Sequence, residues 1–109
     1  FTKGGVSGVA IFAEVAIDER ELLSQLSDKL IGQIKTGVVV LLGDGENGSP
    51  LLVSVSKDLT GTVKAGAILS ELAALMGGKG GGRPDFAQGA VKDRSQAPAA
   101  REKLAQLLS

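Results

Sequence analysis

Residues 38–42 read Val-Val-Val-Leu-Leu, an apolar run of strand length without a polar position. A run that lacks apolar–polar alternation is typical of a strand buried on both faces of a sheet. A helix is predicted directly before this run, and another strand before that helix. Two strands joined through a helix imply a parallel pair with a right-handed crossover. The run therefore indicates an α/β fold.

The segment upstream of this run predicts the first strand and helix of that unit. Residues 6–17 are rich in β-branched and aromatic side chains, and the apolar pair at 11–12 breaks strict alternation. We therefore expect a central strand that is buried on both faces. Asp18 is the expected N-cap of a helix over residues 19–35, whose apolar residues recur every four positions. Gly37 is expected to end this helix.

Downstream of the run, the pattern predicts another strand and a second helix. Residues 43–50 are rich in turn-forming residues, and 51–55 predict a strand antiparallel to 38–42. After a polar loop at 57–62, a helix is expected over residues 63–76. Its expected apolar face consists of Ala65, Ile68, Leu69, Leu72, Leu75 and Met76.

The C-terminal part predicts one more strand and one more helix. Residues 86–91 are expected to form the strand, and Ser95 or Gln96 opens a helix with Pro98 in its first turn. The apolar stripe of this helix is expected to consist of Ala100, Leu104, Leu107 and Leu108. The complete order, β-α-β-β-α-β-α, predicts a single α/β domain over residues 1–109, with helices packed on a mixed sheet of about four to five strands.

The composition is ordinary for a globular domain, but the charge is unevenly distributed. Of the 109 residues, 43% are hydrophobic and 22% are charged, and the formal net charge is zero. Residues 1–54 carry four basic and seven acidic side chains, whereas residues 55–109 carry eight basic and five acidic ones. The second half is therefore better suited to an anionic partner.

The residue types that usually carry catalysis or bind transition metals are missing from the sequence. It has no histidine and no cysteine, which removes the common general base, the thiolate nucleophile and the soft metal ligands. No apolar run reaches the roughly 20 residues that a membrane helix requires. We therefore expect a non-catalytic, cytoplasmic domain with no metal, no cofactor and no membrane contact.

A glycine-rich segment follows the second predicted helix. Residues 77–82 read Gly-Gly-Lys-Gly-Gly-Gly, and Arg83 and Pro84 come next. The first two glycines are typical of a helix end, but three more exceed what a cap and a turn require. The spacing matches neither the P-loop, in which Ser or Thr follows Gly-Lys, nor the dinucleotide fingerprint. We expect an open, basic backbone loop that leads into the strand at 86–91.

This loop is the predicted binding site, and its expected ligand is RNA. Glycine leaves backbone N–H groups accessible to phosphate and ribose oxygens, and the neighbouring cations add charge. Aromatic residues make up only 3% of the chain, so we expect recognition of shape and backbone in place of base stacking. The candidate RNA-binding residues are Gly78, Lys79, Gly80, Gly81, Gly82, Arg83, Gln88, Lys57, Lys64 and Lys92.

The glycine segment and its continuation resemble the signature of a known family. Residues 77–89, Gly-Gly-Lys-Gly-Gly-Gly-Arg-Pro-Asp-Phe-Ala-Gln-Gly, look like the signature of the C-terminal (C-Ala, DHHA1-type) domain of alanyl-tRNA synthetase. The segments 53–59 and 63–66, and their spacing from the signature, are similar to the same family. The resemblance covers residues 36–93 well and the flanks by pattern.

The resemblance implies a role inside a longer enzyme. A C-Ala domain docks on the outer corner, or elbow, of the L-shaped tRNA and helps couple aminoacylation with editing. The implied partner is the tRNA that accepts alanine, and DNA, other RNA and self-association are further candidates. The chain would be a fragment of an alanine–tRNA ligase, and the ATP, magnesium and zinc sites implied for that parent enzyme would lie in its other parts.

Two alternative interpretations remain open at this point. A related accessory domain grips the substrate in DHH-type phosphoesterases, but a histidine tends to follow the glycines there. Arg83 occupies that place in this chain, which favours the synthetase. The second alternative is a dimerisation or protein-interaction module, which requires Leu104 and Leu108 of the last helix to be exposed.

Overall fold

The computed structural model of the chain describes residues 2–3, 6–17, 19–45 and 48–108. Asp18, the expected N-cap, lies outside these residues. The strands are β1 (Thr2–Lys3), β2 (Val6–Ser7), β3 (Val9–Glu14), β4 (Gly37–Leu42), β5 (Ser49–Val55), β6 (Lys79–Gly82) and β7 (Phe86–Val91). The helices are α1 (Arg20–Ile34), α2 (Ala65–Leu75) and α3 (Ala97–Leu107), with short 3-10 helices η1 (Lys57–Leu59) and η2 (Arg94–Gln96).

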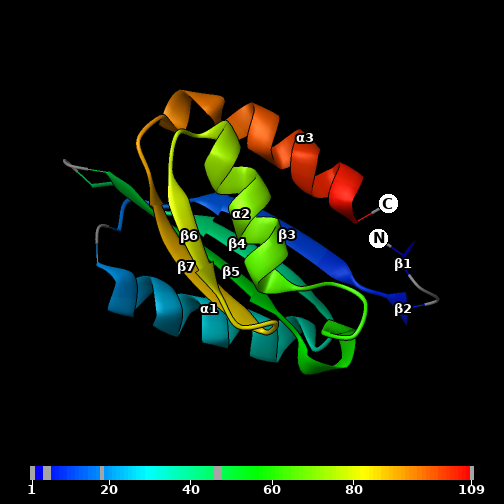
Figure 1. The fold of residues 1–109 in the computed structure, drawn as a ribbon. Coiled ribbons are helices and arrows are strands. Elements are labelled where there is room, and N and C mark those ends of the chain that lie inside the picture. Colours follow the sequence, from blue (N-terminus) through cyan, green and yellow to red (C-terminus); the bar gives the residue numbers. More distant parts are fainter. Residues whose placement is uncertain (1, 4–5, 18, 46–47, 109) are drawn as a thin grey trace.

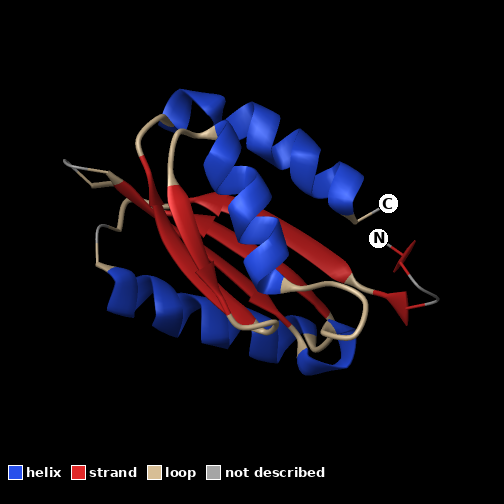
Figure 2. Cartoon of the chain, in the orientation of Figure 1, coloured by secondary structure: helices blue, strands red, loops and turns tan. Residues whose placement is uncertain are grey.

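A mixed sheet lies between two layers of helices (Figure 1). Within the described residues, its five strands are ordered β3-β4-β5-β7-β6, while β1 and β2 pair separately. Helix α1 covers one face of the sheet, and α2 and α3 cover the other (Figure 2). The prediction of an α/β fold with a mixed sheet and packed helices is confirmed.

The unit predicted around residues 38–42 is present. Strands β3 and β4 run parallel, and α1 connects them. Every residue of β4 is buried, and its side chains alternate between the core under α2 and α3 and the core under α1. Strand β5 is antiparallel to β4, as predicted.

Strand β3 differs from the prediction of a central, fully buried strand. Within the described sheet it pairs with β4 alone and lies at the edge, where Val9 is 48% exposed. Ile11 packs against the core on the α1 side, and Phe12 packs against the core on the other side. Apolar residues therefore occupy both faces of β3 because helices lie over both, even at an edge. Broken alternation does not distinguish such an edge strand from a central one.

The end of α1 also differs from the prediction. Lys35 takes the positive φ that ends the helix, 64°, and its N–H donates to the carbonyl of Ile31 at 3.1 Å. Gly37, the expected stop, is instead the first residue of β4. A Cβ at this position would lie 2.1 Å from the carbonyl oxygen of Val9. The glycine therefore permits β3 and β4 to pair closely.

Helices α2 and α3 share one core on the side of the sheet opposite α1. Leu75, expected on the apolar face of α2, is 41% exposed, and Ala73 is buried in its place. Leu75 lies at the margin of the buried face of α2, whose centre is formed by Ala65, Leu69, Leu72 and Met76. Pro98 lies in the first turn of α3, as predicted. Leu104 and Leu108 are 3% and 2% exposed, so the apolar stripe of α3 faces the core.

Candidate nucleic-acid interface

The glycine segment that was expected to be an open loop forms an edge strand. Gly77 ends α2 with a φ of 67°, and residues 79–82 form β6, which pairs antiparallel with β7. The N–H of Arg83 donates to the carbonyl of Phe86 at 2.8 Å and closes the hairpin. All residues of β6 are exposed, as expected for the loop. The loop assignment was wrong because pairing with β7, and not strand propensity, determines the conformation.

Both ends of α2 hold this hairpin in place. The N–H of Ala65, the first residue of α2, donates to the carbonyl of Pro84 in the hairpin turn at 2.8 Å. At the other end, the carbonyl of Met76 accepts the N–H groups of Lys92 and Asp93 at 3.1 and 2.9 Å. A surface held in this way loses little conformational entropy when it binds a ligand.

Packing on the α2 side of the hairpin requires several of the glycines. A Cβ on Gly78 would lie 2.1 Å from the carbonyl oxygen of Ala90. A Cβ on Gly80 would lie 2.7 Å from Cδ2 of Leu69 in α2. One on Gly82 would lie 2.6 Å from a carbonyl oxygen of β7. These distances are far below van der Waals contact, so glycine allows β6 to lie against both β7 and α2.

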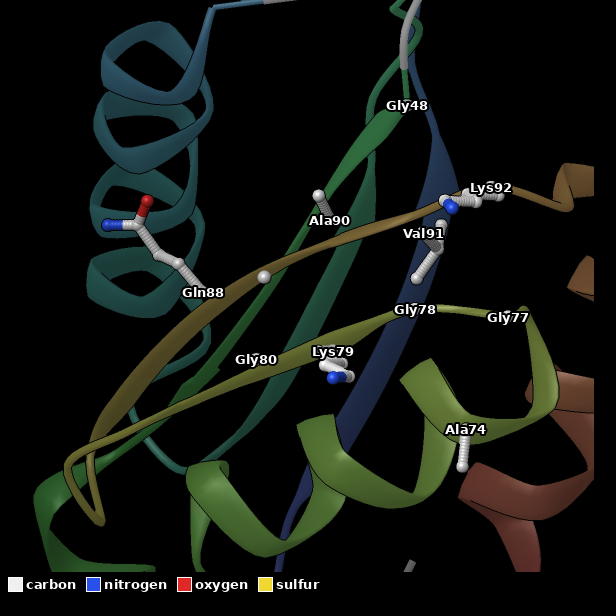
Figure 3. Close-up of a pocket in the computed structure, with 11 residues that line it drawn as sticks. Gly48, Ala74, Gly77, Gly78, Lys79, Gly80, Gln88, Ala90, Val91 and Lys92 are labelled. Carbon is white, nitrogen blue, oxygen red and sulfur yellow. The ribbon is translucent and has the colours of Figure 1, made fainter.

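The opposite side of the hairpin carries polar residues of the predicted site. Gly81 lies opposite Gln88, and Lys79 lies opposite Ala90. Side chains alternate along a strand, so these positions face away from the side on which Gly80 meets α2. Figure 3 shows the Gln88 side chain extending from β7 toward the α1 side of the sheet. Helix α1 packs mainly against β4 and β5. The α1-side face of β6 and β7 therefore stays accessible.

A shallow hollow of about 640 Å³ lies where the hairpin meets the end of α2 (Figure 3). Lys79 and Lys92 line it, and among the described residues that line it none is acidic. Gln88 also lines the hollow, and its side chain extends from β7 toward the α1 side (Figure 3). The structure thus brings together one set of the residues that were predicted to bind RNA: Gly78, Lys79, Gly80, Gln88 and Lys92.

A second set of predicted residues lies at the other end of the hairpin. Lys64, Gly82 and Arg83 line a smaller hollow of about 220 Å³ beside the start of α2. The Lys64 ammonium donates to the carbonyl of Thr60 at 3.2 Å. Nε of Arg83 lies 3.7 Å from a carboxylate oxygen of Asp85, and the Arg83 side chain is 75% exposed. Such an exposed ion pair is weak, and the guanidinium remains accessible to a phosphate.

Lys57 lies on η1 and lines neither of these hollows. Its neighbour Asp58 accepts a hydrogen bond from the hydroxyl of Thr36, and Oγ of Ser56 accepts the N–H of Gly37 at 3.0 Å. Hydrogen bonds from Ser56 and Thr36 hold the pKa of the Asp58 carboxyl below its ordinary value. This polar cluster ties η1 to the start of β4. The sequence did not reveal it, because the hydrogen-bonded side chains are 22 positions apart.

The outer edge of β6 presents backbone hydrogen-bonding groups. Arg83 and Phe86 form a hydrogen-bonded pair, so the alternate positions 81 and 79 also bond to β7. The N–H and C=O groups of Gly80 and Gly82 therefore point away from β7, at the edge of the sheet. Donors of this kind bind phosphate and ribose oxygens.

Neither a metal-binding cluster nor a membrane-spanning helix is present among the described residues. Across the part of the chain that the structure describes, no group of three or more His, Cys, Asp or Glu side chains is placed to hold a metal ion. None of the described helices has both the length and the apolar character needed to cross a membrane.

The fold has a close counterpart among solved structures. It is similar to that in the crystal structure of the C-Ala domain from Aquifex aeolicus alanyl-tRNA synthetase, with a TM-score of 0.85 and 30% sequence identity. The match covers 92% of this chain and 90% of that one. The sequence model of the DHHA1 domain matches residues 8–109. The chain therefore belongs to the DHHA1 domain family.

Curated relatives of this chain are alanine–tRNA ligases. The ligase of Bdellovibrio bacteriovorus is 47% identical over 107 residues, which cover 98% of this chain and 12% of that enzyme. The ligases of Desulfosudis oleivorans and Anaeromyxobacter dehalogenans are 42% and 39% identical, and each match covers 94% of this chain. The chain spans 12%, 12% and 11% of the lengths of these relatives. The predicted resemblance to the alanyl-tRNA synthetase C-Ala domain is confirmed.

Proposed function

We propose that this domain binds tRNA as part of an alanine–tRNA ligase, docks on the outer corner of the L-shaped molecule, and helps couple aminoacylation with editing. The observation that carries the proposal is the exposed β6–β7 hairpin, whose glycine backbone lies among Lys79, Lys92 and Arg83. The partner is the cytoplasmic tRNA that accepts alanine. ATP, magnesium and zinc would serve the parent ligase at sites in its other parts.

The hairpin suits the surface of a folded RNA in two ways. Its exposed cations neutralise phosphates and release counterions, which supplies affinity without reading the bases. The outward N–H groups of Gly80 and Gly82 donate to phosphate or ribose oxygens. The ring of Phe86 packs against the core on the α1 side, so it is not presented for base stacking. The expected recognition is therefore of shape and backbone.

Removing the two cations of the glycine segment tests this proposal. We expect Lys79→Ala/Arg83→Ala to weaken tRNA binding and to lower the slope of log affinity against log salt by about one per lost phosphate contact. A filter-binding titration with alanine tRNA at low and moderate salt measures both quantities. The matched control, Lys29→Ala/Lys35→Gly, removes the same charge from α1 and its C-terminus, and glycine tolerates the positive φ at position 35.

The control separates a local contact from a general charge effect. If both double variants lose affinity equally, the net charge of the domain and not the hairpin governs binding. If Lys79→Ala/Arg83→Ala binds as tightly as the parent chain, the hairpin is not in the interface. Far-UV circular dichroism confirms that each variant retains its fold.

The two alternative functions have less support. Self-association through α3 required Leu104 and Leu108 to be exposed, but both side chains are buried in the core that α3 shares with α2. The curated relatives reported above are ligases, which supports the synthetase over a phosphoesterase.

A further inference from the structure

We propose that Gly81 is an RNA-contact residue, and that the side of the hairpin formed by Lys79, Gly81 and Gln88 lies directly against the ribose–phosphate backbone. The inference rests on the proposed function, because it assigns the tRNA surface to one side of the hairpin. It also separates the glycines by role. The glycines at 78, 80 and 82 allow close packing within the domain. Gly81 leaves room for the ligand to approach the backbone.

Sterics within the domain do not explain a glycine at position 81. A Cβ on Gly81 would meet no described atom within 4 Å, whereas a Cβ on Gly78, Gly80 or Gly82 would collide with backbone. Backbone conformation does not explain it either, because the described glycines with positive φ are Gly48 and Gly77. A glycine inside a strand costs about 0.5–1 kcal/mol relative to alanine. Neither packing nor a turn offsets that cost at Gly81.

The neighbours of Gly81 show which ligand this side of the hairpin fits. Gln88, its cross-strand partner, offers an amide that both donates and accepts hydrogen bonds, as recognition of a 2′-hydroxyl requires. Lys79, two positions away on the same side, supplies a charge for a phosphate. Ala90, opposite Lys79, adds little bulk. The surface is thus low and polar around Gly81, with donors on two sides.

The location of this surface keeps it accessible to a large partner. Helix α1 packs mainly against β4 and β5, and α2 packs on the other side of β6. Lys79, Gly81 and Ala90 are exposed, and Gln88 is half-buried. Lys79 and Gln88 belong both to this side of the hairpin and to the lining of the hollow. A nucleic-acid backbone that fills the hollow therefore passes close to Gly81.

Side chains of increasing size at position 81 test the inference in the 109-residue chain. We expect Gly81→Ala to weaken binding of alanine tRNA by about threefold and Gly81→Leu by about tenfold or more. Because no charge is lost, the salt slope should stay that of the parent chain, unlike that of Lys79→Ala. The matched controls are Gly32→Ala and Gly32→Leu on α1, where a Cβ would also meet no described atom within 4 Å. They should leave the affinity unchanged.

The outcomes distinguish this inference from the proposed function. If Gly81→Leu binds like the parent while Lys79→Ala/Arg83→Ala binds weakly, the function stands and the role of Gly81 is refuted. Equal losses of tRNA affinity in the Gly81 variants and in the matching Gly32 variants also refute the role of Gly81. If the parent chain shows no tRNA binding, both proposals fail together. Thermal unfolding of each variant checks the fold, and Gly81→Ala decides the question if Gly81→Leu does not fold.

Discussion

Strands β4 and β6 belong to one sheet, yet they become strands for opposite reasons. Strand β4 reads Gly-Val-Val-Val-Leu-Leu and is buried throughout, whereas β6 reads Lys-Gly-Gly-Gly and is exposed throughout. The side chains of β4 fill the cores on both faces of the sheet. Strand β6 contributes almost no side chains and is held by pairing with β7 and by close contact with α2. The side chains of β4 stabilise the domain, whereas β6 is positioned by its neighbours β7 and α2. Strand β6 is therefore available for a ligand.

The largest effect is expected from shortening a side chain of β4. Leu41 is fully buried in the core under α1, and Leu41→Ala would remove its contacts and leave a cavity. We expect the free energy of unfolding to fall by about 3 kcal/mol, as measured by urea denaturation. The control Leu75→Ala, at a position that is 41% exposed, should change it by about 0.5 kcal/mol or less. Similar effects at both positions would contradict the role assigned to β4.

A smaller effect on stability is expected from adding one methyl group to β6. At Gly80 the new Cβ would lie 2.6 Å from Cα of Gly89 and 2.7 Å from Leu69, so we expect Gly80→Ala to lower the free energy of unfolding by about 2 kcal/mol. Gly81→Ala, the neighbouring control, should cost nothing or stabilise the strand slightly. Urea denaturation measures both variants. Equal destabilisation would mean that β6 does not have one packed and one open side.

The smallest effect concerns the polar cluster at the start of β4. The folded-state pKa of Asp58 is lowered by hydrogen bonds from Ser56 and Thr36, so its contribution to stability is present above the ordinary pKa of 3.8. That contribution is lost as the pH falls through the folded-state pKa. We expect the difference in Tm between the parent chain and Asp58→Asn to shrink as the pH is lowered from about 5 to about 2.

Removing a hydrogen-bond donor of this cluster provides the control. Thr36→Val leaves the carboxylate of Asp58 in place but deletes one of the hydroxyls that lower its pKa. The difference in Tm between Thr36→Val and the parent chain should therefore also shrink as the pH is lowered over the same range. A difference in Tm that stays constant with pH in both variants would show that the cluster does not couple stability to the charge of Asp58.

Much of the fold could be predicted because the relevant signals are local. Helix α1 lies within the predicted range 19–35, and β7 matches the predicted range 86–91. Periodicity and an unbroken apolar run need no knowledge of the partner segments. The errors fell where a partner decides the outcome. These were the place of Gly37 in β4 and not at the end of α1, the edge position of β3, the exposure of Leu75, and the strand conformation of β6.

The candidate site was predicted in its residue types but not in its arrangement. The glycines and cations between positions 78 and 83 could be named from composition and resemblance. Their division into a packed side and an open side depends on the register with β7, which pairs Gly81 with Gln88. The length of α2 separates Lys64, at its start, from Lys79 and Lys92, which lie near its end.

Three properties follow from the amino-acid sequence without its three-dimensional arrangement: the α/β class, the buried strand at 38–42, and the cationic, glycine-rich character of the segment after α2. These properties follow from side-chain chemistry at positions that are adjacent or periodic along the chain. Tertiary structure alone decided that this segment is a strand at the sheet edge and which glycines it needs for packing. A glycine has no side chain that favours one backbone conformation, so its neighbours in space determine its conformation and its role.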